Sequence, residues 1–149
     1  MVKIIFMGSD PIALPLLECL FSKEIEITAI YTQPDRRSGR GKKIQINAIK
    51  EWGISKGIEI RQPEKPGIEE VEYIKNSNVD VNIVMAYGHI LKRSILDAPR
   101  FGTYNFHASL LPKLRGASPI ETAIATVGSE TGVTLMKIIP RMDAGPIVD

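Results

Sequence analysis

The sequence predicts an α/β protein on a mostly parallel sheet, and three features of its 149 residues lead to that prediction. Residues 2–7 are apolar apart from Lys3, which is typical of a strand buried on both faces. A leucine-rich helical pattern and a second apolar run, 25–32, complete a strand–helix–strand unit. Strands and helices then continue to alternate, which favours a sheet layered between helices.

The first connection has clear local signals. Residues 8–11, Gly-Ser-Asp-Pro, offer a turn, candidate caps and a proline suited to the first helical position. Cys19 lies in the helix that follows, among its apolar positions, so we expect a buried and inert thiol. Those apolar positions are Leu14, Leu16, Leu17 and Leu20.

Hydrophobic periodicity and Gly/Pro punctuation predict the remaining elements. No internal repeat, low-complexity tract or linker interrupts the sequence, so we expect one domain, a Rossmann-like three-layer sandwich. The expected helices cover 46–56, 68–75, 91–96 and 119–127, and the expected strands cover 57–60, 80–87, a run ending at His107, and 132–139.

Composition restricts the protein's class. Hydrophobic residues make up 44% of the chain and charged residues 24%, as in soluble globular proteins. No apolar run approaches the roughly 20 residues that span a bilayer, and the amino-terminal run is too short for a signal peptide. A single cysteine excludes an internal disulfide. We therefore expect a cytoplasmic protein.

The positive charge is concentrated in one segment, 33–43, which contains five basic residues and a single acidic one, Asp35. Composition alone is compatible with a solvated surface loop. The segment is nevertheless long for a strand-to-helix connection, and guanidinium groups suit bidentate phosphate contacts. A phosphate backbone, hence nucleic acid, is the partner that this loop favours. Its basic residues are Arg36, Arg37, Arg40, Lys42 and Lys43.

Two side chains able to do chemistry end the strand that precedes Ser-Leu-Leu-Pro. Asn105 and His107 are two residues apart, so they project to the same side of a strand. Ligand crevices of α/β sheets form outside the carboxyl ends of the strands. Asp143 lies in a later Gly/Pro-rich turn, where it could orient the histidine. In isolation, a turn cap and a hydrogen-bonded surface histidine explain the first pair equally well.

These groups suit attack of an amine on an acyl donor. Asn105 would donate to the developing oxyanion, and His107 would stabilise that charge or move protons. Ser109 shows no sign of an activated-serine motif. Gly8 stands alone rather than in a dinucleotide fingerprint and no Walker lysine is present, which disfavours nicotinamide and nucleoside triphosphates. Metal binding has only His89 and His107 and is also disfavoured.

The chain resembles the folate-dependent formyltransferases. The resemblance rests on Asn-x-His at 105–107, Ser-Leu-Leu-Pro at 109–112, Arg-Gly at 115–116 and the late Asp143. Thr-Gln-Pro-Asp at 32–35, followed by the basic segment, resembles the members that formylate methionyl initiator tRNA.

The resemblance implies a reaction and a site. A formyl group would pass from 10-formyltetrahydrofolate to the amino group of methionyl initiator tRNA, with Asn105, His107 and Asp143 as catalytic residues and no metal. The basic segment would lie against the tRNA acceptor stem. The implied folate-binding residues are Ser109, Leu110, Leu111 and Pro112, together with the backbone of Met85, Ala86, Tyr87 and Gly88.

The family's fold continues beyond the motifs of this chain. Full-length members, expected to be monomers, carry further strands and helices and a C-terminal β-barrel that helps to bind tRNA. We therefore expect residues 1–149 to form an incomplete catalytic domain without that barrel. Two alternatives stay open: a formyltransferase that acts on a sugar-nucleotide or another small amine, and a non-catalytic module that binds folate or RNA.

Overall fold

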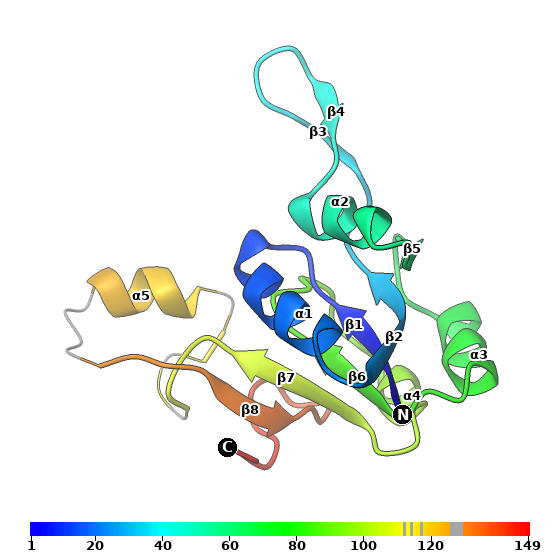
Figure 1. Cartoon of the computed structure of the whole chain (residues 1–149). Coiled ribbons are helices and arrows are strands. Elements are labelled where there is room, and N and C mark those ends of the chain that lie inside the picture. Colours follow the sequence, from blue (N-terminus) through cyan, green and yellow to red (C-terminus); the bar gives the residue numbers. More distant parts are fainter. Residues whose placement is uncertain (112, 114, 117, 126–129) are drawn as a thin grey trace.

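The computed structural model describes residues 1–111, 113, 115–116, 118–125 and 130–149. In these residues, a six-stranded sheet in the order β5-β2-β1-β6-β7-β8 forms the centre of the fold (Figure 1). Five strands are parallel and β8 is antiparallel to β7, so the expected α/β fold is confirmed. The strands are β1 (Val2–Met7), β2 (Ile25–Tyr31), β5 (Glu59–Arg61), β6 (Val81–Val84), β7 (Thr103–His107) and β8 (Thr134–Lys137).

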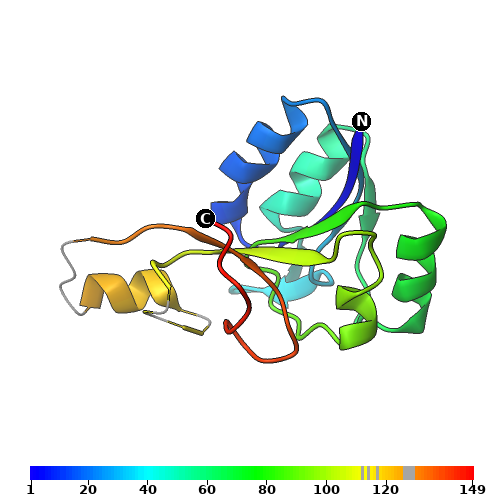
Figure 2. The ribbon, with the colours of Figure 1, turned by 90° about the horizontal axis from the view of Figure 1, so that it is seen from below.

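Helices cover both faces of the sheet (Figure 2). One face holds α1 (Leu14–Phe21), which follows a short 3-10 turn η1 (Pro11–Ala13), and α2 (Ala48–Ser55). The opposite face holds α3 (Ile68–Asn76) and α4 (Arg93–Leu96). A further helix, α5 (Pro119–Ala125), has no buried residue. No helix among the described residues is long and apolar enough to cross a membrane.

The central strand β1 explains the continuous apolar run at the start of the sequence. Ile4 and Phe6 are buried against α1 and α2, whereas Ile5 and Met7 are buried in the cluster beneath α3 and α4. Successive residues of a strand point to opposite faces, so a strand covered on both faces must be apolar throughout.

The expectation for Cys19 was wrong, because its side chain is exposed. Helix α1 buries Leu17 fully, and its other leucines are partly buried. Cys19 lies two positions after Leu17, about 200° around the helix, and so faces solvent. The apolar stripe of α1 is narrower than its leucine content suggests.

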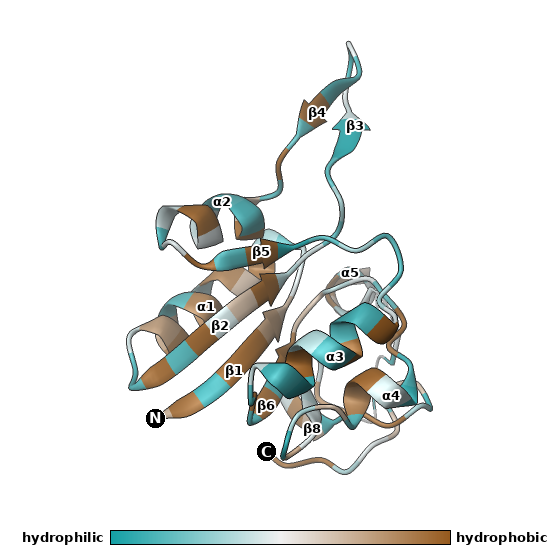
Figure 3. Cartoon of the chain, turned by 90° about the vertical axis from the view of Figure 1, so that its right-hand side faces the viewer, coloured by the Kyte–Doolittle hydropathy of each residue, from teal (hydrophilic) through white to brown (hydrophobic). Residues whose placement is uncertain are grey.

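The basic segment, which we expected to be a surface loop, forms most of a β-hairpin. β3 (Arg36–Ser38) pairs antiparallel with β4 (Lys43–Gln45) in a separate two-stranded sheet. Gly39, Gly41 and Lys42 make the turn with φ of 74°, 99° and 49°. Figures 1 and 3 show the hairpin projecting beyond α2, away from the main sheet.

Other predicted elements exist with shifted bounds. β6 ends at Val84, before the predicted end at 87, because the chain turns at Ala86 (φ 50°) and Gly88 (φ 81°). The predicted helix 119–127 corresponds to α5, and residues 126–127 lie outside the described residues.

Candidate active site

Strand β7 carries Asn105 and His107 to the carboxyl edge of the sheet on one face. Thr103, which shares that face, donates its hydroxyl to the carbonyl of Leu96 in α4 at 2.9 Å. Alternation therefore places Asn105 and His107 on the α4 side of the sheet, while Phe106 packs with the α1–α2 cluster. The predicted common orientation of the pair follows from this register.

Asp143, which the sequence offered as a residue that could orient His107, lies beside it. Its Oδ1 is 3.8 Å from His107 Nδ1, and both side chains are largely buried, with 13% and 7% exposed. The other carboxylate oxygen, Oδ2, accepts a hydrogen bond from the backbone N–H of Gly116 at 2.7 Å. The contact with the imidazole becomes an ion pair when that ring is protonated.

The loop after β7 is held by Thr134 of β8. Its hydroxyl donates to the carbonyl of Ser109 at 2.6 Å and accepts from the backbone N–H of Leu111 at 3.0 Å. Ser109 is fully buried and donates its own hydroxyl to the carbonyl of Lys113 at 2.8 Å. Leu110, in contrast, is 45% exposed. Pro112, the last predicted residue of this loop, lies outside the described residues.

Thr134 was missed as a site residue in the sequence analysis. It pairs with His107 in the β7–β8 ladder, so it stands directly opposite the predicted catalytic histidine. The signal available in the sequence was its place at the start of an expected strand, but a threonine there is ordinary for a strand. Its role depends on pairing between segments that are far apart in the chain.

The predicted folate segment, 85–88, follows β6 at the same edge. β6 and β7 are neighbours, with Val84 paired to Asn105, so this segment begins beside the strand end that carries Asn105 and His107. Ser9 binds it from the end of β1: the Ser9 N–H donates to Ala86 O at 2.9 Å, and the Ser9 hydroxyl donates to Tyr87 O at 2.8 Å. Met85 and Tyr87 are buried, while Ala86 is exposed.

The hairpin leaves the sheet from this same edge, after β2. All residues 36–46 are exposed, including the five basic side chains that we predicted to contact RNA. β2, β1, β6 and β7 are parallel, so their carboxyl ends lie at one edge of the sheet. The hairpin, the segment 85–88 and the loop after β7 all leave the sheet at this edge. The sequence did not predict that the hairpin lies at this edge, because the three segments are far apart in the chain.

His89 follows the segment 85–88 and lies within electrostatic range of Arg36 in the hairpin. Its ring meets that of Tyr87 edge-on, with centroids 4.9 Å apart. Burial lowers the pKa of the His89 imidazole, the positive charge of Arg36 lowers it further, and the carboxylate of Glu64 partly opposes both effects. The imidazole is therefore held in its neutral form near pH 7.

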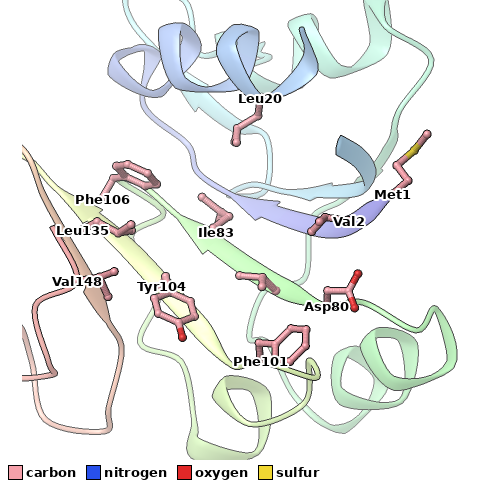
Figure 4. Close-up of a pocket in the computed structure, with 11 residues that line it drawn as sticks. Met1, Val2, Leu20, Asp80, Ile83, Phe101, Tyr104, Phe106, Leu135 and Val148 are labelled. Carbon is pink, nitrogen blue, oxygen red and sulfur yellow. The ribbon is translucent and has the colours of Figure 1, made fainter. Parts of the chain in front are cut away.

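A large apolar groove of about 640 Å³ lies on the opposite face of the sheet (Figure 4). Leu20 of α1, Ile83 of β6, and Tyr104 and Phe106 of β7 contribute to its walls. None of the predicted site residues lines it. The groove is thus separate from the chemistry-bearing face.

The carboxyl edge thus brings together an amide, an imidazole and a carboxylate. An amide N–H and an imidazole can stabilise a negative charge that develops on a substrate oxygen, and the carboxylate can orient the imidazole. Among the residues that the structure describes, no group of three or more His, Cys, Asp or Glu side chains could hold a metal ion. The arrangement suits acyl transfer to an external nucleophile.

Comparison with known protein families agrees with this chemistry. Residues 2–149 match the family described as Formyl transferase. The chain belongs to the formyl transferase family, which the Asn-x-His and Ser-Leu-Leu-Pro motifs had indicated.

Relatives within the family specify the resemblance further. The chain is 46% identical over 148 residues to the methionyl-tRNA formyltransferase of Methylococcus capsulatus, covering 99% of this chain and 48% of that protein. It is also 46% identical over 150 residues to the enzyme of the same name from Clostridium tetani, with the same coverage. The chain spans about half the length of the curated relatives it matches.

Solved structures share the fold at lower identity. The phosphoribosylglycinamide formyltransferase of Bacillus halodurans superposes with a TM-score of 0.77 at 22% identity, over 99% of this chain and 77% of that one. Glycinamide ribonucleotide transformylase 1 of Geobacillus kaustophilus gives 0.78 at 19% identity, over 100% and 80%. These likenesses confirm the Rossmann-like fold.

Proposed function

We propose that this chain is the catalytic region of an enzyme that formylates methionyl initiator tRNA with 10-formyltetrahydrofolate. The observation that carries the proposal is the buried approach of Asp143 to His107 on the face that also bears Asn105. The names of the relatives that are 46% identical point to the same reaction. The β-barrel domain expected from the family resemblance stays a prediction.

The three residues divide the transfer between them. The amino nitrogen of the acceptor attacks the formyl carbon, and the carbonyl electrons move to the oxygen. Asn105 donates its side-chain N–H to that oxyanion, an interaction worth about 3 kcal/mol in comparable sites. Collapse of the intermediate breaks the bond from the formyl carbon to the folate nitrogen. The proton lost by the amine reaches the departing nitrogen, with His107 as carrier.

Asp143 acts on the imidazole in this proposal. The attraction between its carboxylate, near Nδ1, and the imidazole fixes the ring's orientation while a proton is in transit. Burial of both side chains strengthens these electrostatic effects, because water does not screen them. Asp143 is held in turn by the N–H of Gly116.

The substrates would occupy two parts of the same edge. The folate would lie between the loop of Ser109, Leu110 and Leu111 and the backbone of 85–88, which combine apolar surface with polar backbone groups. The tRNA would lie against the exposed basic hairpin, whose guanidinium and ammonium groups suit phosphates. Their common origin at one edge supports a single reaction site for both.

An acceptor comparison tests the identity of the amine. The complete reading frame that carries this chain is incubated with 10-formyltetrahydrofolate and either methionyl initiator tRNA, free methionine or an amino-sugar nucleotide. We expect formylation of methionyl-tRNA, with transfer to each small amine slower by at least about a hundredfold. Of these acceptors, only the tRNA has a continuous phosphate backbone that several basic side chains of the hairpin can contact at once.

Two outcomes would contradict the proposal. Faster transfer to the amino-sugar nucleotide would indicate a small-amine formyltransferase. Binding of tetrahydrofolate or tRNA without formyl transfer to any acceptor would indicate a non-catalytic binding module.

A further inference from the structure

The hairpin β3–β4 cannot set its own direction. All its residues are exposed, and an isolated two-stranded hairpin is at best marginally stable in water. Its orientation relative to the sheet must therefore come from contacts at its root, where residues 33–35 leave β2 and Asn47 enters α2.

Asp35 binds two different elements at this root. Its Oδ2 accepts a hydrogen bond from Lys50 Nζ of α2 in a largely shielded ion pair, with 24% and 17% of the two side chains exposed. Its Oδ1 accepts from Gln62 Nε2 at 2.9 Å, just after β5. The same Gln62 amide donates to the carbonyl of Gln33 at 2.9 Å. The first leg is thus tied to α2 and to the end of β5.

The second leg is tied to the same helix. Asn47 caps α2, with its Oδ1 accepting from Lys50 N at 2.9 Å. Its Nδ2 donates to the Oγ1 of buried Thr32 at 2.8 Å, at the end of β2. The first turn of α2 therefore fixes both ends of the hairpin. The side chain of Lys50 holds the incoming segment at Asp35, and the side chain of Asn47 holds the outgoing segment.

The contacts of Asp35 with Lys50 and Gln62 also leave the basic side chains of 33–43 without an acidic partner inside the segment. Asp35 is the single acidic residue of 33–43, and it is bound to Lys50 and Gln62 at the root. Hydrogen bonds from Lys50 and then from Gln62 lower the pKa of the Asp35 carboxyl, so it stays ionised. Arg36 contacts Glu64 at 3.7 Å, and the other four basic side chains make no ion pair with the described residues.

We propose that Asp35, clamped by Lys50 and Gln62, is a positioning residue that aims the basic hairpin at the RNA substrate. The proposal rests on the proposed function, in which the hairpin contacts tRNA phosphates. Asp35 itself touches neither substrate. It decides how many of the hairpin's cations reach phosphates at once.

The sign of the effect separates positioning from simple electrostatics. Asp35→Ala removes a negative charge beside the hairpin, so electrostatics alone predicts tighter RNA binding. Loss of the clamp predicts the opposite, because a hairpin without a fixed direction presents fewer cations together. Asp97→Ala is the matched control: it removes the same charge from an exposed ion pair with Arg93, at the C-cap of α4, which Figure 3 shows at the far end of the fold from the hairpin.

The principal test measures tRNA binding of the complete reading frame that carries this chain at several salt concentrations. We expect Asp35→Ala to weaken binding at least about fivefold and to reduce the slope of log K against log salt by about 1 to 3, because each lost phosphate contact removes about one unit. Gln62→Ala, which changes no charge, should act in the same direction. Asp97→Ala should leave the slope unchanged.

Two further readouts separate positioning from general damage. In the complete reading frame, Asp35→Ala should raise the KM for methionyl-tRNA and leave kcat and the KM for 10-formyltetrahydrofolate unchanged. The chain's single cysteine, exposed Cys19, allows spin labelling together with Ser38→Cys in β3. The distance distribution between these labels should broaden when Asp35→Ala is added.

One further variant separates failure of the positioning role of Asp35 from failure of the proposed RNA contact. The combined substitution Arg40→Gln, Lys42→Gln and Lys43→Gln should lower the salt slope; an unchanged slope would overturn the proposed RNA contact itself. If that variant lowers the slope while Asp35→Ala and Gln62→Ala bind tRNA as tightly as the unaltered chain, the positioning role alone is overturned.

Discussion

Asp143 serves two partners with its two carboxylate oxygens. One lies 3.8 Å from His107 Nδ1 and the other accepts a hydrogen bond from Gly116 N, so the same side chain contacts both the imidazole and the backbone after β7. Asp143 has φ 46°, in the left-handed region that aspartate tolerates better than most residues. Strained backbone conformations concentrate at functional sites, which agrees with a catalytic role for this residue.

His89 makes the stability of the chain depend on pH. Its folded-state pKa lies below the unfolded value of about 6.5, because burial and Arg36 disfavour the charged ring. Between those two values the unfolded state binds more protons, so the free energy of unfolding falls as pH is lowered from about 6.5. His89→Gln should remove this contribution, because glutamine does not titrate.

Urea denaturation of the chain and of the His89→Gln variant between pH 7.5 and 5 measures that contribution. The difference in unfolding free energy between the two proteins should shift in favour of the variant as pH falls. A difference that is constant over this range would contradict the expected pKa.

The sequence predicted the positions of some single residues correctly and of others wrongly. Asn105 and His107 were predicted to share a face, because alternation along one strand is local. Cys19 was placed in the core because its neighbours are leucines, although its angular position opposite Leu17 was the better guide. Thr134 was missed because its contact with Ser109 depends on pairing between distant strands.

Helix α2 shows how one element supports another. Asn47 provides its N-cap and also binds Thr32 at the end of β2. Asn47→Ala should lower the free energy of unfolding by about 1–2 kcal/mol, the usual cost of losing an N-cap. Asn47→Asp should lose less, because aspartate caps helices well but lacks the amide donor to Thr32.

Chemical denaturation of these two variants checks the expectation. Equal stability of the alanine variant and the unaltered chain would contradict the capping role. Equal losses in the two variants would assign the stabilisation to the hydrogen bond with Thr32 instead.

The hairpin β3–β4 was the element that the sequence did not predict. Arg36–Ser38 and Lys43–Gln45 lack the apolar alternation that signals a strand, because neither face of the hairpin is buried. Backbone pairing and a glycine-containing turn define it instead. Buried strands were predictable from their apolar runs, whereas an exposed one was not.

At the scale of the whole molecule, the order of strands assembles the site. β1 lies between β2 and β6, so the ends of β2, β6 and β7 meet at one edge although they are far apart in the chain. The alternation of elements predicted a parallel sheet, and therefore a crevice at this edge. The approach of Asp143 to His107 was a hypothesis from residue type, since no local pattern encodes that distance.

The central claim is that Asn105 and His107 carry formyl transfer. The most direct measurement is the single-turnover rate of formyl transfer to methionyl-tRNA by the complete reading frame, with Asn105→Ala and His107→Ala. The control is Asn76→Ala, at the exposed last residue of α3. We predict that each site variant loses at least about a hundredfold in rate while its fold and tRNA binding are retained, and that the control is unaffected. A rate near that of the unaltered protein in either site variant would contradict the account.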